Sequence, residues 1–167
     1  MRPVSVTVGN PQDRRRRTVG RSMGRVILLI LCLCTFPGAG YGDGGIAVSS
    51  REGAAVYAAA KRYLDAEVRR DLPGVYDALA PSSAYRAKYD YAAFLAEADS
   101  SPVRIVAYKI VRVDHIRDNH DPKAFPGVEK FAQVEVDIVI LYEDTKQRAD
   151  VNFAFTFIRE DGKWYKG

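Results

Sequence analysis

The sequence predicts an α+β domain in which N-terminal helices pack on a curved antiparallel sheet. Two observations favour this fold class. Up to Pro102 the apolar residues recur at three- and four-residue steps, and beyond it they recur at every second residue. The first spacing is typical of a helix face and the second of a strand face. Helices followed by antiparallel strands indicate a sheet covered by helices on one face.

The first 42 residues are interpreted as a secretory signal that is cleaved. Arg14 to Arg17 precede an apolar run of 11 residues, Val26 to Phe36, and small residues follow from Gly38 to Gly42. This run is shorter than the roughly 20 residues of a membrane-spanning helix. A retained helix that anchors the chain is the alternative. We expect export to the periplasm or the extracellular space, no stable membrane span, and a flexible spacer over residues 43–49.

Removal of this leader changes the charge and the cysteine content of the chain. The whole sequence carries a net charge of +4, and its first 42 residues hold seven Arg and one Asp. Subtracting this +6 from +4 leaves −2 for residues 43–167. Cys32 and Cys34 both lie in the leader. We therefore expect no nucleic-acid partner, and an exported domain held by its core rather than by disulfides.

The first helix of the domain is expected to run to Arg70. Ser49 and Glu52 form a capping-box pattern at its start. We expect Glu67 on its wet side, together with most of its other charged residues. Its apolar stripe comprises Val56, Ala59, Ala60, Tyr63, Leu64 and Val68.

Two shorter helices are expected to follow. Asp71 is an N-cap type, Pro73 suits the first turn after it, and Pro81 ends that helix. Asp90 caps the next helix, which ends at residues 100–102. Residues 82–89 are expected to form a polar connector.

Four strands are expected after Pro102. The Asp-Gly pair at 161–162 is the hairpin signal before the last of them. The expected strands are Val103–Ile116, which is long and bent, Val128–Tyr142, Ala149–Phe157 and a last strand from Lys163.

Order and pattern in three segments resemble the nuclear-transport-factor-2-like superfamily, a cystatin-like α+β roll. The segments are Ala58–Asp65, Arg70–Pro81 and Phe157–Tyr165. The resemblance covers residues 50–167 and implies a cone-shaped roll with a pocket between sheet and helices. The superfamily contains isomerases, dehydratases and non-catalytic binding domains, and its members often dimerise through the sheet. Such a fold by itself fixes little about function.

Aromatic residues are the candidates for lining this pocket around an apolar ligand. They are Tyr63, Tyr76, Phe94, Phe153, Phe155 and Trp164. The alternative is that these residues simply form the core.

Strand alternation places the acidic residues away from this pocket. Glu135 and Asp137 alternate with Val134, Val136 and Ile138, so they share the outer face if the apolar residues meet the helices. We therefore assign no catalytic residue. The outer face also carries Val139, Leu141, Ala154 and Ile158, a mixed patch that could join two copies.

The histidines do not form a convincing metal site. His115 and His120 lie in or beside a polar loop, separated by four residues that include Arg117. This is not a usual zinc spacing, so we expect no metal and no cofactor.

Three functional hypotheses follow from the sequence. The first is an exported non-enzymatic domain that binds a small apolar ligand or a protein partner. The second is an isomerase- or dehydratase-like enzyme that uses the cone pocket. The third is an interaction subunit whose pocket is filled by its own side chains.

Overall fold

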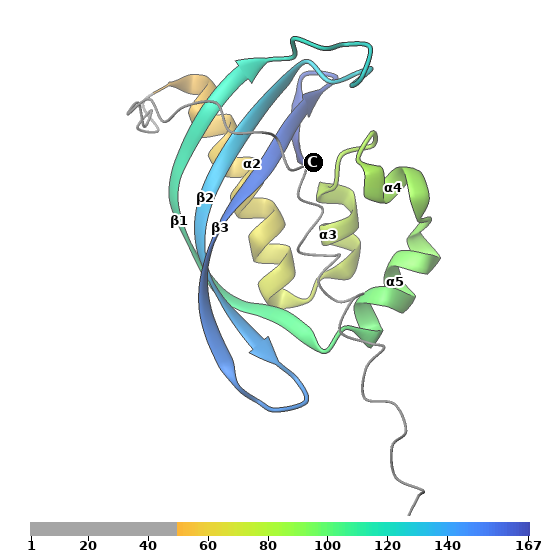
Figure 1. Cartoon of the computed structure of the whole chain (residues 1–167), viewed down its shortest axis with the longest axis vertical. Helices are drawn as coiled ribbons and strands as arrows, with labels where there is room; N and C mark the ends of the chain where they lie inside the picture. Colours follow the sequence, from red (N-terminus) through yellow and green to blue (C-terminus); the bar gives the residue numbers. More distant parts are fainter. Residues whose placement is uncertain (1–49) are drawn as a thin grey trace, which may run out of the picture. The chain divides into compact units, whose positions relative to one another are not determined.

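A computed structural model of the chain describes residues 50–167, which form helices followed by an antiparallel sheet (Figure 1). The expected α+β class is confirmed. The expected signal peptide (1–42) and spacer (43–49) lie outside the described residues. The helices are α2 (Arg51–Arg69), α3 (Leu72–Ala78), α4 (Ala84–Lys88) and α5 (Tyr91–Ser100), and the strands are β1 (Val103–Asp118), β2 (Lys130–Tyr142), β3 (Arg148–Glu160) and β4 (Lys163–Lys166).

Helix α2 begins one residue later than the capping box predicts. Ser50 is the N-cap, and its hydroxyl accepts a hydrogen bond of 2.9 Å from the backbone N–H of Gly53. Glu52 instead binds Lys130 of β2 at 2.9 Å, so it does not close a capping box. The expectation of Ser49 as the cap is wrong because the second serine satisfies the free N–H of the first turn.

Helices α3 and α5 begin at the expected caps, because Asp71 accepts from the N–H of Gly74 and Asp90 from the N–H of Ala93. The segment between them is not the plain connector that was expected. Ser83 caps the five-residue helix α4 by accepting from the N–H of Arg86. The five residues of this helix are too few to show an apolar period, so the sequence does not predict it.

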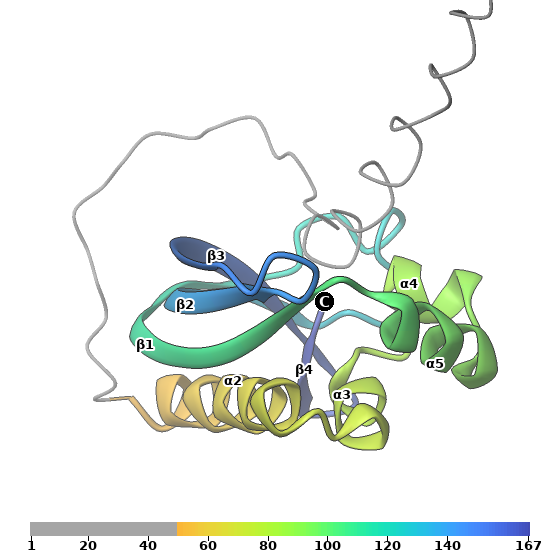
Figure 2. The ribbon, with the colours of Figure 1, turned by 90° about the horizontal axis from the view of Figure 1, so that it is seen from below.

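The sheet has the order β1-β2-β3-β4 and curves without closing. Helix α2 lies across one face, beneath β1 and β2 in Figure 2. Val134, Val136 and Ile138 of β2 face this helix and are at most 1% exposed. The pairing of β2 with β3 is uninterrupted, whereas β1 shifts register against β2 in three places.

The β3–β4 hairpin turns at Asp161 and Gly162, whose φ angles of 47° and 72° are both positive. Positive φ at both central residues is the mark of the type I′ turn that the Asp-Gly pair predicts. Strand β4 is only four residues long, and its Lys166 carbonyl accepts from the N–H of Ala80 at 2.8 Å. The turn into α4 is tied to the same hairpin, because the buried Glu160 carboxylate accepts from the hydroxyl and the N–H of Ser82.

A small second core lies at the hairpin end of the sheet. It corrects one prediction about the outer face: Ile158 is 6% exposed, because it packs with this cluster instead of facing solvent. The cluster contains Ala80, Val128, Phe131 and Ile158, with Phe125 and Tyr165 packed against it.

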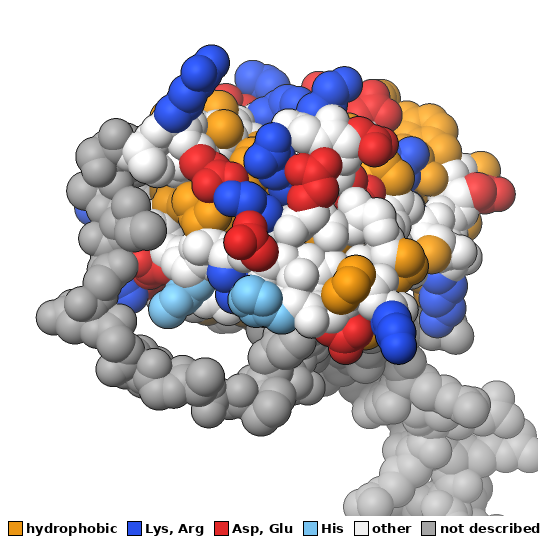
Figure 3. Space-filling view, turned by 90° about the horizontal axis from the view of Figure 1, so that it is seen from above, with side chains coloured by type: hydrophobic (Ala, Val, Ile, Leu, Met, Phe, Trp, Pro, Cys, Tyr) orange, Lys and Arg blue, Asp and Glu red, His pale blue; other side chains and the backbone are white. Residues whose placement is uncertain are grey.

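Acidic and basic side chains pair with one another near the start of α2 and the adjacent end of the sheet. Lys130 lies 2.9 Å from Glu52, and Arg159 lies 3.1 Å from Glu129. Figure 3 shows acidic and basic side chains interspersed on the side seen from above. This face is therefore not a single-sign basic surface of the kind that attracts nucleic acid. None of the helices within residues 50–167 is long and apolar enough to cross a membrane.

Replacing the N-cap tests the start of α2. We expect Ser50→Ala to lower the free energy of unfolding by about 1 kcal/mol, because the Gly53 N–H loses its acceptor. Urea denaturation followed by circular dichroism measures the difference. Ser49→Ala is the matched control and should leave the midpoint nearly unchanged. A larger loss in the control would restore Ser49 as the cap.

Candidate functional site

The structure brings half of the predicted pocket residues together beneath the sheet. The rings of Tyr63 and Phe155 meet edge to face with centroids 6.1 Å apart, and Phe153 lies 6.1 Å from Phe155. Trp164 of β4 is also buried, at 6% exposed. Tyr63, Phe155 and Trp164 are buried, whereas Phe153 is half-buried.

Tyr76 and Phe94 belong to a separate aromatic cluster among the short helices. Their ring centroids are 5.3 Å apart, the Tyr91 ring contacts both, and the Tyr85 ring contacts that of Phe94. The Arg86 guanidinium lies over the Tyr76 ring at 4.7 Å. No ring contact between residues 50 and 167 joins this cluster to the Tyr63 group, so the structure does not bring all six residues together.

An acid–tyrosine pair lies in the interior, although strand alternation places the acidic residues of the sheet away from the predicted pocket. The Tyr63 hydroxyl donates a 2.7 Å hydrogen bond to Glu67, one helical turn further along α2. Glu67 is half-buried instead of lying on the wet side, which corrects the prediction for this residue. The i, i+4 spacing from a residue of the apolar stripe was the signal that could have revealed it.

Burial perturbs both groups of this pair. Removal from water raises the pKa of the Glu67 carboxyl, although the hydrogen bond from Tyr63 and the charge of Lys166 oppose the shift. Burial and the neighbouring Glu67 raise the pKa of the Tyr63 hydroxyl well above its usual value. A carboxyl whose pKa is raised beside a tyrosine is the kind of group that acid–base catalysis uses.

A second tyrosine–carboxylate bond joins the sheet to the helix. The Tyr108 hydroxyl of β1 donates to Asp65 of α2 at 2.6 Å, and Lys61 lies 2.6 Å from the same carboxylate. Hydrogen bonds from Lys61 and Tyr108 lower the pKa of Asp65, whereas burial and then Asp65 raise the pKa of Tyr108 to about 12. This carboxylate is already ionised and paired, so it serves as a tie between α2 and β1.

A depression of about 440 Å³ lies on the sheet face opposite α2. The strand registers place six of its lining side chains on that face, with Lys109 opposite Asp137 and Asp137 opposite Asn152. Two of the register shifts of β1, at 105/107 and 110/112, flank the part that lines it. Because such irregularities bend a strand, the hollow lies where β1 bends. The six side chains are Ala107, Lys109, Asp137, Val139, Asp150 and Asn152.

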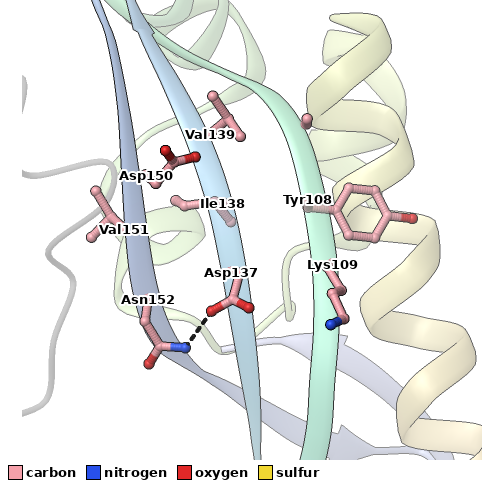
Figure 4. A pocket seen from close by; sticks show the side chains of 9 residues that line it. Tyr108, Lys109, Asp137, Ile138, Val139, Asp150, Val151 and Asn152 are labelled. Atoms are coloured by element: carbon pink, nitrogen blue, oxygen red, sulfur yellow. Dashed lines mark hydrogen bonds between the residues drawn. The ribbon is translucent and has the colours of Figure 1, made fainter.

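The polar groups of this depression form a small network. Asn152 donates to Asp137 at 2.8 Å (Figure 4) and to Glu135 at 3.2 Å. Glu135 also lies 2.8 Å from Arg112. Asp137 is exposed on the outer face, as the strand alternation predicted, and the neighbouring Tyr108 points away toward α2 in Figure 4.

The histidines lie at the far end of β1. His115 is exposed and has a positive φ of 52° where β1 shifts register, and His120 is exposed in the following loop. Within residues 50–167, no three His, Cys, Asp or Glu side chains are grouped so that they could hold a metal ion.

No model of a known protein family matches the chain, and neither a curated protein nor a solved structure matches it. The site must therefore be interpreted from its own geometry.

Neutralising Glu67 tests its buried environment. A carboxyl whose pKa is raised by folding contributes most to the stability of the folded state below its unfolded pKa of about 4.3. This contribution to stability is lost as the pH rises through the raised pKa. We expect Glu67→Gln to unfold at higher urea than the wild type at pH 7, because an amide avoids the cost of a buried charge. The difference in unfolding midpoint between Glu67→Gln and the wild type should disappear below pH 4.

Tyr63→Phe provides the matched comparison on the same helix. It removes the hydrogen bond to Glu67 and should lower the free energy of unfolding by about 1–2 kcal/mol at pH 7. A Glu67→Gln protein less stable than the wild type at pH 7 would show that the ionised carboxylate is satisfied there.

Proposed function

We propose that this chain is an exported, non-enzymatic binding domain that holds a protein partner on the outer face of its sheet. The observation that carries the proposal is the open depression of about 440 Å³ across β1, β2 and β3. Its lining mixes apolar and charged groups, as the surfaces of protein interfaces do.

The packing of the helix-facing side supports this choice over a small apolar ligand. Tyr63, Phe155 and Trp164 are each less than 8% exposed, and the Tyr63 ring meets the Phe155 ring edge to face. Side chains packed in this way serve as core. This agrees best with the third hypothesis from the sequence, an interaction subunit whose interior is filled by its own side chains.

The chemistry of the depression favours a partner that presents apolar and basic groups together. Asp137 and Asp150 place two carboxylates beside one ammonium group, Lys109, around Val139 and Ala107. The depression is open to solvent, whereas pockets for small molecules enclose most of the ligand surface. A protein side chain can use such a hollow while the rest of the partner covers the surrounding strands.

Site-specific photo-crosslinking in the producing cell tests this function. A crosslinking amino acid in place of Lys109 should give a discrete adduct containing a second polypeptide, and adding Asp137→Lys should reduce its yield. Ala92 on α5, which is also exposed, is the matched control position. Equal adducts from both positions, or none from position 109, would refute a partner at this face.

The buried Tyr63–Glu67 pair favours a second candidate function, an isomerase- or dehydratase-like enzyme. Burial raises the pKa of the Glu67 carboxyl, and a carboxyl shifted in this direction suits a role as a general acid. Catalysis at this pair would require substrate and solvent to reach the Tyr63 hydroxyl.

Nitration with tetranitromethane measures that access. Tyr57 lies on the same helix and is 37% exposed, so it should react first. If the domain is a binding module, Tyr63 should stay unmodified while Tyr57 reacts fully, as read by peptide mass spectrometry. Nitration of both at similar rates would favour the enzyme.

A further inference from the structure

Strand β3 has an edge that no described strand occupies along most of its length. Strand β3 has 13 residues and β4 has four, so β4 pairs only with Phe157–Glu160. Beyond this ladder, Gly167 donates its N–H to the Thr156 carbonyl at 3.0 Å. No residue of the described chain pairs with the same edge over Arg148–Phe155, which extends to the β2–β3 turn (Figure 1).

The two ends of β3 show which backbone groups face this edge. The Thr156 carbonyl points toward the β4 side, and the Gln147 carbonyl points toward β2, where it accepts from Tyr142 at 2.9 Å. The β2–β3 register is continuous between these points. The backbone N–H and C=O groups of successive residues therefore point alternately toward β2 and toward the open edge. The even-numbered residues from Arg148 to Ala154 therefore direct both N–H and C=O outward.

An apolar row lies beside this edge on the helix-facing side. Ala149, Val151 and Phe153 are each half-buried, because α2 packs mainly on β1, β2 and β4. Main-chain groups and apolar side chains are thus available along the same eight residues. An edge of this kind is a template for another strand.

We propose that β3 pairs antiparallel with β3 of a second copy of this chain, about a two-fold axis at Val151. This register places Asp150 opposite Asn152 of the second copy, and Arg148 opposite Ala154. Val151 meets its own copy, and Ala149 meets Phe153. The residues with outward N–H and C=O groups then face one another, as an antiparallel ladder requires.

The neighbouring registers fit less well. An axis at Asp150 places two aspartates directly opposite one another, and like charges in that position are destabilising. An axis at Asn152 loses the two Asp–Asn pairs. The axis at Val151 creates both of them and joins the apolar rows, so the β3 sequence is self-complementary there. This favours a second copy over an unrelated extended peptide.

The pairing would enlarge the outer-face depression. Asp150 and Asn152 line it from β3, the strand at the open edge. In the dimer the same residues of the second copy would continue that surface across the axis. The expected contact runs through the edge of the sheet, and it leaves the outer face free for a partner.

Placing like or opposite charges at the two-fold axis tests the proposal. Val151→Lys and Val151→Glu each place two like charges together at the two-fold axis. Measured by sedimentation velocity on the purified chain, each variant alone should raise the dimer dissociation constant at least about tenfold. An equimolar mixture of the two should restore a dimer within about threefold of the wild-type constant, because opposite charges then meet.

Thr145→Lys is the matched control, because it adds a charge in the β2–β3 turn away from the axis and should leave dimerisation unchanged. Circular dichroism checks that each variant is folded. A wild-type chain that stays monomeric up to sub-millimolar concentration would overturn the proposal. So would a mixture that dissociates as readily as the single variants. These outcomes leave the crosslinking test at Lys109 unaffected, so the two proposals can fail separately.

Discussion

The burial of one side of β2 is the constraint on which the rest of the structure depends. Val134, Val136 and Ile138 are almost fully covered on the side of α2. Because side chains alternate along a strand, a shift of one residue would bring Glu135 and Asp137 under the helix. The cost of burying two unpaired carboxylates fixes the register. That register places Asp137 and Val139 on the outer face, and through pairing it places Lys109, Asp150 and Asn152 beside them.

The sequence predicts those features that depend on local chemistry. The alternation of β2 and β3, the caps Asp71 and Asp90, and the Asp-Gly turn all follow from residues close together in the chain. The predicted position of the first cap is wrong by one residue, because Ser49 and Ser50 carry the same side chain and the sequence does not distinguish them. Strand period alone could not place Ile158, and helix period puts Glu67 on the face of Tyr63 without showing how deeply that face is covered. Their burial depends on Ala80, Val128 and the β4 region, which only the fold brings near.

The outer-face depression has no signal in the sequence for a related reason. Its lining residues come from three strands, and the register shifts of β1 that flank it are marked by no motif. The interior aromatic residues, by contrast, are visible in the sequence but divide into two clusters in space. A pattern of aromatic residues thus indicates burial without saying which residues share a site. The geometry moves the candidate site from the interior to the solvent side of the sheet.

The irregular pairing of β1 has a consequence for how large an assembly can become. A sheet with a regular strand at each border could add copies at both ends and grow into a fibre. In the described part of the chain, β1 forms one border, and its shifts and the positive φ of His115 break its ladder. Such interruptions are a recognised defence against edge-to-edge growth. Two chains joined at β3 would present β1 at both outer ends, so growth would stop after one addition.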